Sequence, residues 1–386
     1  MRIKFLLFTI TLLIAKNGLF AQITVSGILD SSVSVRAGAG EAPAFSYGFE
    51  EYANIRMQAK LKEKAVFHGA FNVIAAAGDS AAAAEQIAGL TEGENYIAGI
   101  ELERLYFQLN GEYLDLDGGL LRLPFGYGQV WGSSDFLNPK NPLAPDARPR
   151  AVLGAGLSWY PADSLKLLGF GAAPRDPSSR SGEGGLFGVS ADHHWDRASV
   201  QALYSFESPK DGSNNGRHRA GLSVKADLEA GIVMDALYTY NNEAETKIDG
   251  LSFSIGADYS LFDGNLIVLA EYLYNGETSS TAFNSGENIY GWHNENYLYT
   301  AFTWRFNDFT SMTAALLSGF DDVSFTPIIT LTHELFQGAA LTVSAQIPLD
   351  RDLFSGNGSR GELGPLPPGS DTGRYFDCSA KLRLRF

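Results

Sequence analysis

Two sets of charged residues could together create an electric field across the interior of this protein. Within short segments they occupy alternate positions, and most residues between them are apolar, so each set faces one side of its segments. Basic residues come from the two ends of the chain and acidic residues from its middle, which predicts that they face each other if the segments form a closed sheet. Opposed charges orient polar solutes and select among ions; the alternative is that they only hydrate or pair on an inner wall. The basic set is Arg36, Arg56, Lys60, Arg104, Arg122, Lys381, Arg383 and Arg385, and the acidic set is Asp192, Asp235, Asp258, Glu271 and Glu334.

The segment 126–150 could bring further side chains into the same space. Three glycines open it, and four prolines between residues 139 and 149 prevent a regular strand or helix. Such a loop can be stiff without being regular, and an inward fold would narrow the interior. The alternative is an external loop whose tryptophan and prolines pack on the rim. An inward loop would present Trp131, Asp135, Asn138, Arg148 and Arg150.

Catalysis and metal binding find little support in the sequence. Each histidine could act as a base for a nearby serine, but serine-rich strands give any histidine such a neighbour by chance. The acidic pair 321–322 and the acidic residues of 350–371 lack the ligand spacing of a calcium loop. We therefore predict a protein that is not an enzyme and uses no metal or other cofactor. The histidines considered are His193, His194, His218 and His333.

The element that must position the charges is a β-strand, and residues 373–386 show its pattern most clearly. A strand with one apolar and one charged face separates an apolar medium from water. The single cysteine, Cys378, lies on the apolar face, where it would serve as a small packing residue. The apolar face carries Phe376, Cys378, Ala380, Leu382, Leu384 and Phe386, and the other face carries Tyr375, Asp377, Ser379, Lys381, Arg383 and Arg385.

Similar alternation recurs along the chain and predicts eighteen strands. Tight connections alternate with longer ones that are rich in Gly, Ser, Asn, Asp and Pro, as in an up-and-down barrel whose two ends differ. Merging segments near 321–322 or within 151–173 would give sixteen strands instead. The predicted strands lie near 22–36, 46–64, 65–76, 99–110, 113–125, 151–160, 165–173, 185–195, 198–208, 217–228, 231–242, 249–261, 265–276, 295–307, 309–321, 323–336, 339–351 and 373–386.

No apolar run after residue 21 is long enough for a helix to cross a membrane. Any crossing must therefore be made by strands that satisfy their backbone groups within a closed barrel. Aromatic residues near strand ends, such as Trp159 and Trp304, suit the interface between membrane and water. The fold class that we predict is all-β, a transmembrane antiparallel up-and-down β-barrel formed by residues 22–386.

Residues 1–21 have the pattern of a secretory signal peptide. Arg2 and Lys4 precede an apolar run from Phe5 to Ala15, and the segment ends at Ala21, after which we predict cleavage. The run is too short to span a bilayer as a helix. We therefore expect Sec-type export of the chain.

The composition agrees with a large barrel. Of 386 residues, 42 are glycine, 12% are aromatic and only 19% are charged, unlike the Lys- and Glu-rich content of a soluble helical protein. The formal net charge of -15 argues against nucleic acid as a partner.

The alternation that closes on Phe386 resembles the last strand of Gram-negative outer-membrane β-barrels. In that family the barrel-assembly machinery reads the terminal aromatic residue, so the resemblance implies an assembly signal at Phe386 and outer-membrane lipid around the protein. Residues 126–139 combine G-x-G, a tryptophan and D-x-x-N-P, and they resemble a pattern of alginate-export and related porin-like barrels. The resemblance implies an integral outer-membrane protein.

Two functions from different classes remain open. Eighteen strands leave a lumen too wide for side chains alone to fill, which favours a porin-like channel for passive diffusion of small hydrophilic solutes across the outer membrane. In that case the segment 126–150 would constrict the pore. The alternative is a surface-exposed adhesin or ligand-binding barrel with a closed lumen. The sequence predicts neither the solute nor the oligomeric state.

Overall fold

The structure is a computed structural model that describes most of the predicted barrel. The predicted signal peptide and the loop residues Arg148 and Arg150 lie outside the described residues. Within the described part, no helix is long and apolar enough to cross a membrane. The described residues are 22–39, 45–61, 64–78, 80, 91–92, 96–138, 140, 142–143, 151–173, 183–209, 216–240, 250–276, 294–321, 323–349 and 374–386.

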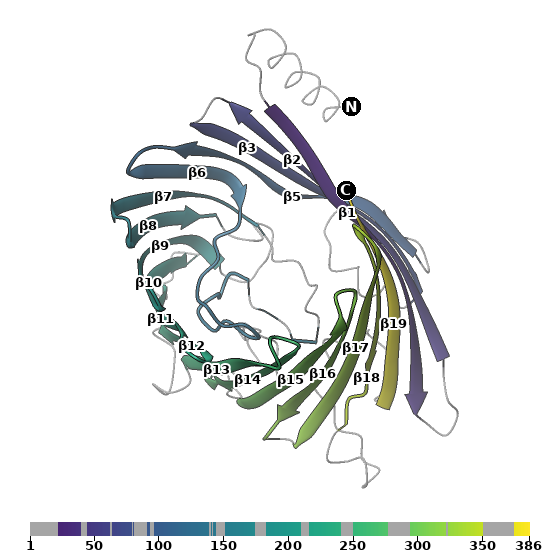
Figure 1. Cartoon of the computed structure of the whole chain (residues 1–386). Coiled ribbons are helices and arrows are strands. Elements are labelled where there is room, and N and C mark those ends of the chain that lie inside the picture. The colour runs from purple at the N-terminus through teal and green to yellow at the C-terminus, as the bar shows by residue number, and fades with distance from the viewer. Residues whose placement is uncertain are drawn as a thin grey trace.

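Eighteen antiparallel strands form a closed barrel in which successive strands pair side by side (Figure 1). The barrel closes where β1 pairs with β19, in a register from Ile28 opposite Arg385 to Ala39 opposite Arg374. The labels reach β19 because the two-residue β4 adds only a short bridge to β5. The predicted up-and-down barrel and its eighteen strands are confirmed. The strands are β1 (Gln22–Ala39), β2 (Phe45–Leu61), β3 (Ala65–Gly78), β4 (Thr91–Glu92), β5 (Tyr96–Asn110), β6 (Leu114–Leu121), β7 (Val152–Ala162), β8 (Leu165–Ala172), β9 (Glu183–His194), β10 (Ala198–Pro209), β11 (Arg217–Asp227), β12 (Gly231–Tyr240), β13 (Leu251–Leu261), β14 (Leu266–Asn275), β15 (Asn296–Asn307), β16 (Thr310–Gly319), β17 (Ser324–Phe336), β18 (Ala339–Gln346) and β19 (Arg374–Arg385).

The two ends of the barrel differ in the length of their connections. At one end short turns join strand pairs, for example 195–197 between β9 and β10 and 337–338 between β17 and β18. The beginning of β1 and the C-terminal residue also lie at this end. We call it the short-turn end. Most connections at the other end are longer, as the sequence predicted, but 320–323, between β16 and β17, is no longer than the turn 262–265 between β13 and β14.

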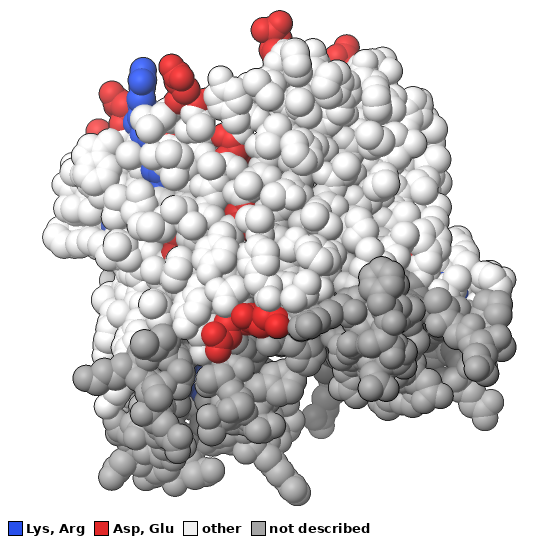
Figure 2. Space-filling view, turned by 90° about the horizontal axis from the view of Figure 1, so that it is seen from below, with Lys and Arg blue, Asp and Glu red and all other residues white. Residues whose placement is uncertain are grey.

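The outer surface of the barrel is apolar because alternate side chains of each strand point away from the lumen. Ile100, Leu153 and Ile329 expose 69%, 62% and 56% of their surface. The side of the barrel in Figure 2 is mostly free of charged side chains. Such a surface suits the hydrocarbon of a membrane, as predicted for a transmembrane barrel.

The inner face of many strands is polar. On β13, Ser252 and Ser254 are almost fully buried on the inner side, whereas Ile255 is exposed on the outer side. The alternation predicted for this strand is therefore confirmed.

Strand β5 departs from strict alternation at Glu103. The register between β3 and β5 shifts by one residue there, which makes Glu103 the extra residue of a β-bulge. Glu103 and Arg104 therefore lie close together, with 3.3 Å between a carboxylate oxygen and the guanidinium Nε. The sequence carries a signal of the bulge, because two charged residues separate Leu102 from Leu105 where alternation allows one.

The C-terminal residue completes the seam between the two ends of the chain. The N–H of Gly27 donates to the carbonyl of Phe386 at 2.9 Å, and the N–H of Phe386 donates back at 3.1 Å. A Cβ on Gly27 would lie 2.6 Å from the Phe386 ring, so the ring covers the glycine. The terminal aromatic residue is thus part of the closure.

Replacing Phe386 by Asp should impair assembly, because a charge would then stand in the apolar face beside the seam. Heat-modifiable migration in gels and outer-membrane yield measure this. Phe336→Asp is a matched control, since Phe336 is equally exposed, at 65%, and lies at the same end without being a chain terminus. Normal assembly of the Phe386→Asp variant would contradict the expectation.

Candidate functional site

A loop that follows β6 folds into the barrel. In Figure 1 the chain runs inward from the wall after β6 and reaches the side formed by β12 to β15. We call residues 122–138 the lumen loop. Arg122, at the start of the loop, donates a hydrogen bond to Glu103 on β5, and residues 126–134 form hydrogen bonds with side chains or carbonyls of β10 to β14.

Two carboxylates of the wall hold the backbone of the lumen loop. The N–H groups of residues 127 and 128 donate to Asp235 on β12 at 3.0 and 2.8 Å. The N–H groups of residues 129, 130 and 131 donate to Glu271 on β14 at 3.0, 2.9 and 3.1 Å. Both carboxylates are fully buried. Because consecutive N–H groups converge on each of them, the loop solvates two charges that the barrel wall would otherwise leave unpaired.

The glycines of the G-x-G motif permit this close approach. Gly126 has a φ of 77°, in the region that favours glycine, and its N–H donates to Gln201 at 2.7 Å. A Cβ on Gly128 would lie 2.5 Å from the nitrogen of Gly132 and 2.9 Å from a carboxylate oxygen of Asp235. Side chains at these two positions would therefore push the loop off its carboxylates.

Apolar side chains hold the same loop against the wall. Phe125 stacks on Phe136 with ring centroids 5.9 Å apart and contacts Phe170 of β8 at 5.0 Å. Trp131 has no exposed surface and packs against Tyr297 and Tyr299 of β15. The two clusters form the hydrophobic core of the molecule, inside the barrel.

The inner wall beneath the loop carries apolar as well as polar side chains, whereas the alternation predicted a polar inner face. Leu203, Leu237 and Leu273 alternate with polar residues on the inner faces of β10, β12 and β14, and all three are buried. The physical reason is the loop, which replaces water as their neighbour. The sequence carried a signal for this loop, since these strands are apolar on both faces. Lipid covers the outer face, and only a segment inside the barrel could cover the inner one.

The predicted loop residues lie within this packing. Trp131, Asp135 and Asn138 are 0%, 7% and 8% exposed, so they support the shape of the loop and do not face open water. Asp135 and Asn138 form a turn in which the N–H of Asn138 donates to the carbonyl of Asp135 at 3.0 Å. Burial raises the pKa of Asp135 to about 7, although Lys140 and hydrogen bonds from Asn138 and Phe125 act in the opposite direction.

The predicted acidic set divides into covered and open residues. Asp235 and Glu271 lie beneath the loop. Asp192 accepts a hydrogen bond from the Gln201 amide at 2.6 Å, and Asp258 accepts one from the Gln129 amide at the same distance. Glu334 is exposed near the short-turn end. Asp235, Asp258 and Glu271 therefore bind the loop, and the prediction that these acids face the water of the lumen needs correction for Asp235 and Glu271, which are fully buried.

The predicted basic set lies on the remaining wall, and several members are paired with carboxylates. Arg383 forms two hydrogen bonds with Asp30, both at 2.7 Å. Arg122 contacts Glu103 at 2.5 Å, and Arg36 contacts Asp377 at 3.2 Å. The partners Asp30 and Glu103 were missed because neither stands out in the sequence from other strand acids. Lys381 and Arg385 lie on β19, with Arg385 exposed at its end.

Arg56 and Lys60 differ from these paired residues. Both side chains are exposed, and the Nε of Arg56 donates to Asn54 rather than to a carboxylate, at 2.6 Å. Arg56 and Arg104 line a small polar pocket of about 190 Å³ on β1, β2, β3 and β5. Its polar lining also includes Thr24, Ser26, Gln58 and His68.

The four histidines considered for catalysis make separate local contacts. His193 packs on Trp195, with ring centroids 4.2 Å apart. In the described part of the chain, no group of three or more His, Cys, Asp or Glu side chains is arranged to hold a metal ion. The Nδ1 atoms of His194, His218 and His333 lie 2.9, 2.8 and 2.9 Å from the hydroxyls of Ser199, Tyr204 and Thr310.

Glu271→Ala should loosen the lumen loop, because three backbone N–H groups lose their acceptor. Each hydrogen bond to a charged group contributes about 1.5–3 kcal/mol, so the loss is large compared with thermal energy. We expect faster hydrogen exchange at amides 129–131 and larger, noisier single-channel currents. Glu334→Ala is the control, because Glu334 is an inward acid that does not touch the loop. It should change neither the hydrogen exchange of amides 129–131 nor the single-channel current. Unaltered exchange in the Glu271→Ala protein would contradict this role.

The Asp135 carboxyl should make the loop pH-dependent. Its pKa is raised from the ordinary 3.8 to about 7, so the folded loop binds the proton more tightly than the unfolded chain does. The contribution to stability is therefore full below about pH 4 and is lost as the pH rises through about 7. Hydrogen exchange of the loop amides should accelerate over that range in the wild type beyond its intrinsic pH dependence. Asp135→Asn should remove the excess, and an identical profile in both proteins would argue against it.

Comparison with solved structures finds the same fold in outer-membrane porins of Acinetobacter and Pseudomonas. The sequence matches no protein-family model and no curated protein. OccAB4 of Acinetobacter baumannii is 13% identical with a TM-score of 0.58, over 96% of this chain and 100% of that chain. The BenF-like porin of Pseudomonas fluorescens Pf-5 is 10% identical with a TM-score of 0.57, over 96% of this chain and 100% of that one. OccK5 (OpdH) of Pseudomonas aeruginosa is 10% identical with a TM-score of 0.55, over 94% and 98%. The chain therefore has the closed eighteen-strand barrel fold of these porins.

Proposed function

We propose that the chain is an outer-membrane, porin-like channel through which small hydrophilic solutes diffuse passively. The observation that carries the proposal is the lumen loop, which is fixed to one side of a wide barrel and so narrows the lumen. A barrel of eighteen strands is too wide for wall side chains to close by themselves. The shared fold with a BenF-like porin supports the same function, and the apolar outer surface supports residence in the membrane.

The distribution of charge favours anions at the narrowed level. Because the loop covers Asp235 and Glu271, these two carboxylates are withdrawn from the water of the lumen. The exposed Arg56 and the neighbouring Arg104 line the pocket of about 190 Å³ on the wall formed by β1, β2, β3 and β5. A net positive potential there would raise the local concentration of anionic solutes.

The remaining roles complete the proposal. The chain acts without catalysis and without a cofactor, and the barrel-assembly machinery inserts it through the Phe386 end. The basic residues Arg36, Arg122, Lys381 and Arg383 shape the field of the pore, and the carboxylates paired with the three arginines reduce its strength. The alternative, an adhesin or ligand-binding barrel with a closed lumen, is disfavoured by the porin fold. A refolded protein that inserts into planar bilayers and never conducts would support that alternative and contradict the channel.

Neutralising Arg56 and Arg104 together, as Arg56→Gln and Arg104→Gln, should shift ion selectivity toward cations. The barrel should stay folded, because Arg56 is exposed, and Glu103, the ion-pair partner of Arg104, keeps its second partner Arg122. Reversal potentials under a salt gradient measure the shift, which should grow as the ionic strength falls. The control pair Arg197→Gln and Arg305→Gln removes two exposed charges near the short-turn end. Wild-type reversal potentials in the Arg56 and Arg104 double variant would show that these residues do not control permeation.

A further inference from the structure

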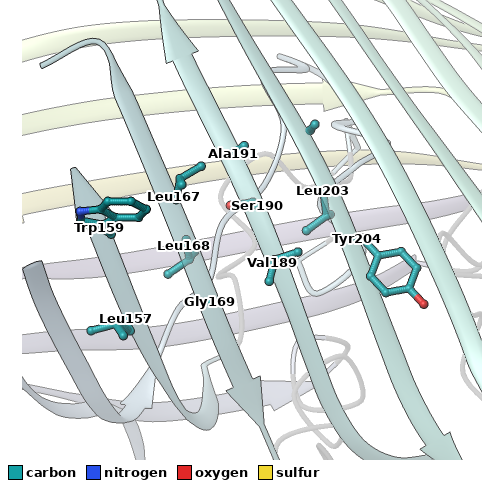
Figure 3. A pocket seen from close by; sticks show the side chains of 11 residues that line it. Leu157, Trp159, Leu167, Leu168, Gly169, Val189, Ser190, Ala191, Leu203 and Tyr204 are labelled. Carbon is teal, nitrogen blue, oxygen red and sulfur yellow. The ribbon is translucent and has the colours of Figure 1, made fainter. Parts of the chain in front are cut away.

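A groove of about 500 Å³ lies across β7 to β10 (Figure 3). In Figure 3 Trp159 and Tyr204 stand at opposite sides of the group, with leucine and valine side chains between them. The strand register arranges the lining in two neighbouring rows. One row is Leu157, Gly169, Val189 and Tyr204, and the next is Trp159, Leu167, Ala191 and Ala202.

The groove opens on the outer face of the barrel. Leu157, Val189 and Tyr204 expose 50%, 58% and 47% of their surface, as outward residues do. Ser190 and Leu203 belong to the lining but are buried, which fits side chains that point inward and leave only backbone at the floor. The groove is therefore continuous with the apolar outer band and separate from the lumen.

Small residues create the hollow, and the backbone does not require them. A Cβ on Gly169 would meet nothing within 4 Å, and Gly169 is not among the glycines with positive φ. Ala191 on β9 and Ala202 on β10 lie opposite each other in the neighbouring row. The groove is the space that Gly169, Ala191 and Ala202 leave between larger side chains of the lining, and a larger side chain at Gly169 could fill part of it without strain.

We propose that this groove binds one acyl chain of a phospholipid in the leaflet at the short-turn end. Trp159 lies three positions before the end of β7, and the exposed Trp195 stands in the adjacent turn, so both mark the interface at that end. The groove begins at the level of Trp159 and continues one row deeper into the membrane. Its position thus matches an acyl chain whose headgroup lies near the short turns.

The chemistry of the lining fits a hydrocarbon chain. None of the lining residues is charged, and the Tyr204 hydroxyl is satisfied by the Nδ1 of His218 at 2.8 Å. In a membrane, apolar association depends on van der Waals packing rather than on escape from water. A chain seated in a groove contacts more atoms than a chain on a flat wall, and an unfilled hollow forfeits those contacts. The proposal depends on the membrane location and is independent of conduction.

Quenching by lipids with brominated acyl chains tests the proposal, because Trp159 lines the groove. The purified full-length protein in unbrominated detergent would be titrated with phospholipid brominated on its chains. Subtracting the fluorescence of the Trp159→Phe variant from that of the wild type gives the fluorescence of Trp159 alone. We expect saturable quenching at a low mole fraction of lipid in the wild type and its loss in Gly169→Leu and Ala202→Leu, which fill the groove. Ala257→Leu enlarges an exposed outward residue on β13 and should keep the saturable quenching.

Three outcomes would overturn the proposal. Quenching that rises linearly with lipid fraction, and equally in all variants, would indicate only unspecific contact with surrounding lipid. Loss of saturation in Ala257→Leu as well would indicate a general effect of added bulk. Dissociation of an oligomer by Gly169→Leu in sedimentation experiments would identify a second copy of the chain as the occupant. Heat-modifiable migration verifies that each variant is folded before it is titrated.

Discussion

The convergence of consecutive backbone N–H groups on Asp235 and Glu271 is the interaction on which the interior of this barrel depends. Removing a carboxylate from water costs several kcal/mol unless hydrogen bonds replace the lost hydration. A loop backbone is likewise stable inside a barrel only if its polar groups find partners. The wall acids and the lumen loop therefore stabilise each other, and the glycines at 126 and 128 allow them to approach.

This mutual requirement makes the lumen asymmetric. On the side of β8 to β16, the loop and apolar side chains of the inner wall form two buried clusters, one around Phe125 and one around Trp131. On the side of β1 to β5 and β19, polar and charged side chains form ion pairs such as that between Arg383 and Asp30. These carboxylate partners make the positive potential on this wall weaker than the basic residues alone would produce. Arg56 is exposed and bonds to an amide, so it contributes more to the field than its paired neighbours.

The fold was predictable from the sequence because period-two alternation directly reflects which side of a strand meets lipid. All eighteen barrel strands agree with the predicted segments within a few residues, except at strand ends next to long connections such as that after β6. The contacts of the lumen loop were harder to predict from the sequence. Alternation places Glu271 on the inner face, but it cannot reveal that a distant loop covers this residue. The apolar residues on both faces of β14 were visible in the sequence, but their meaning becomes clear only once the loop is known to cover the inner face.

A cross-link can test whether the lumen loop keeps this position in the channel that we propose. The hydroxyls of Ser134 in the loop and Ser223 on β11 lie 2.9 Å apart. In a Cys378→Ser background, Ser134→Cys and Ser223→Cys should form a disulfide in lipid bilayers, and single-channel currents before and after oxidation should be equal. Absence of the disulfide, or a current that changes when it forms, would show that the loop lies elsewhere when the pore conducts.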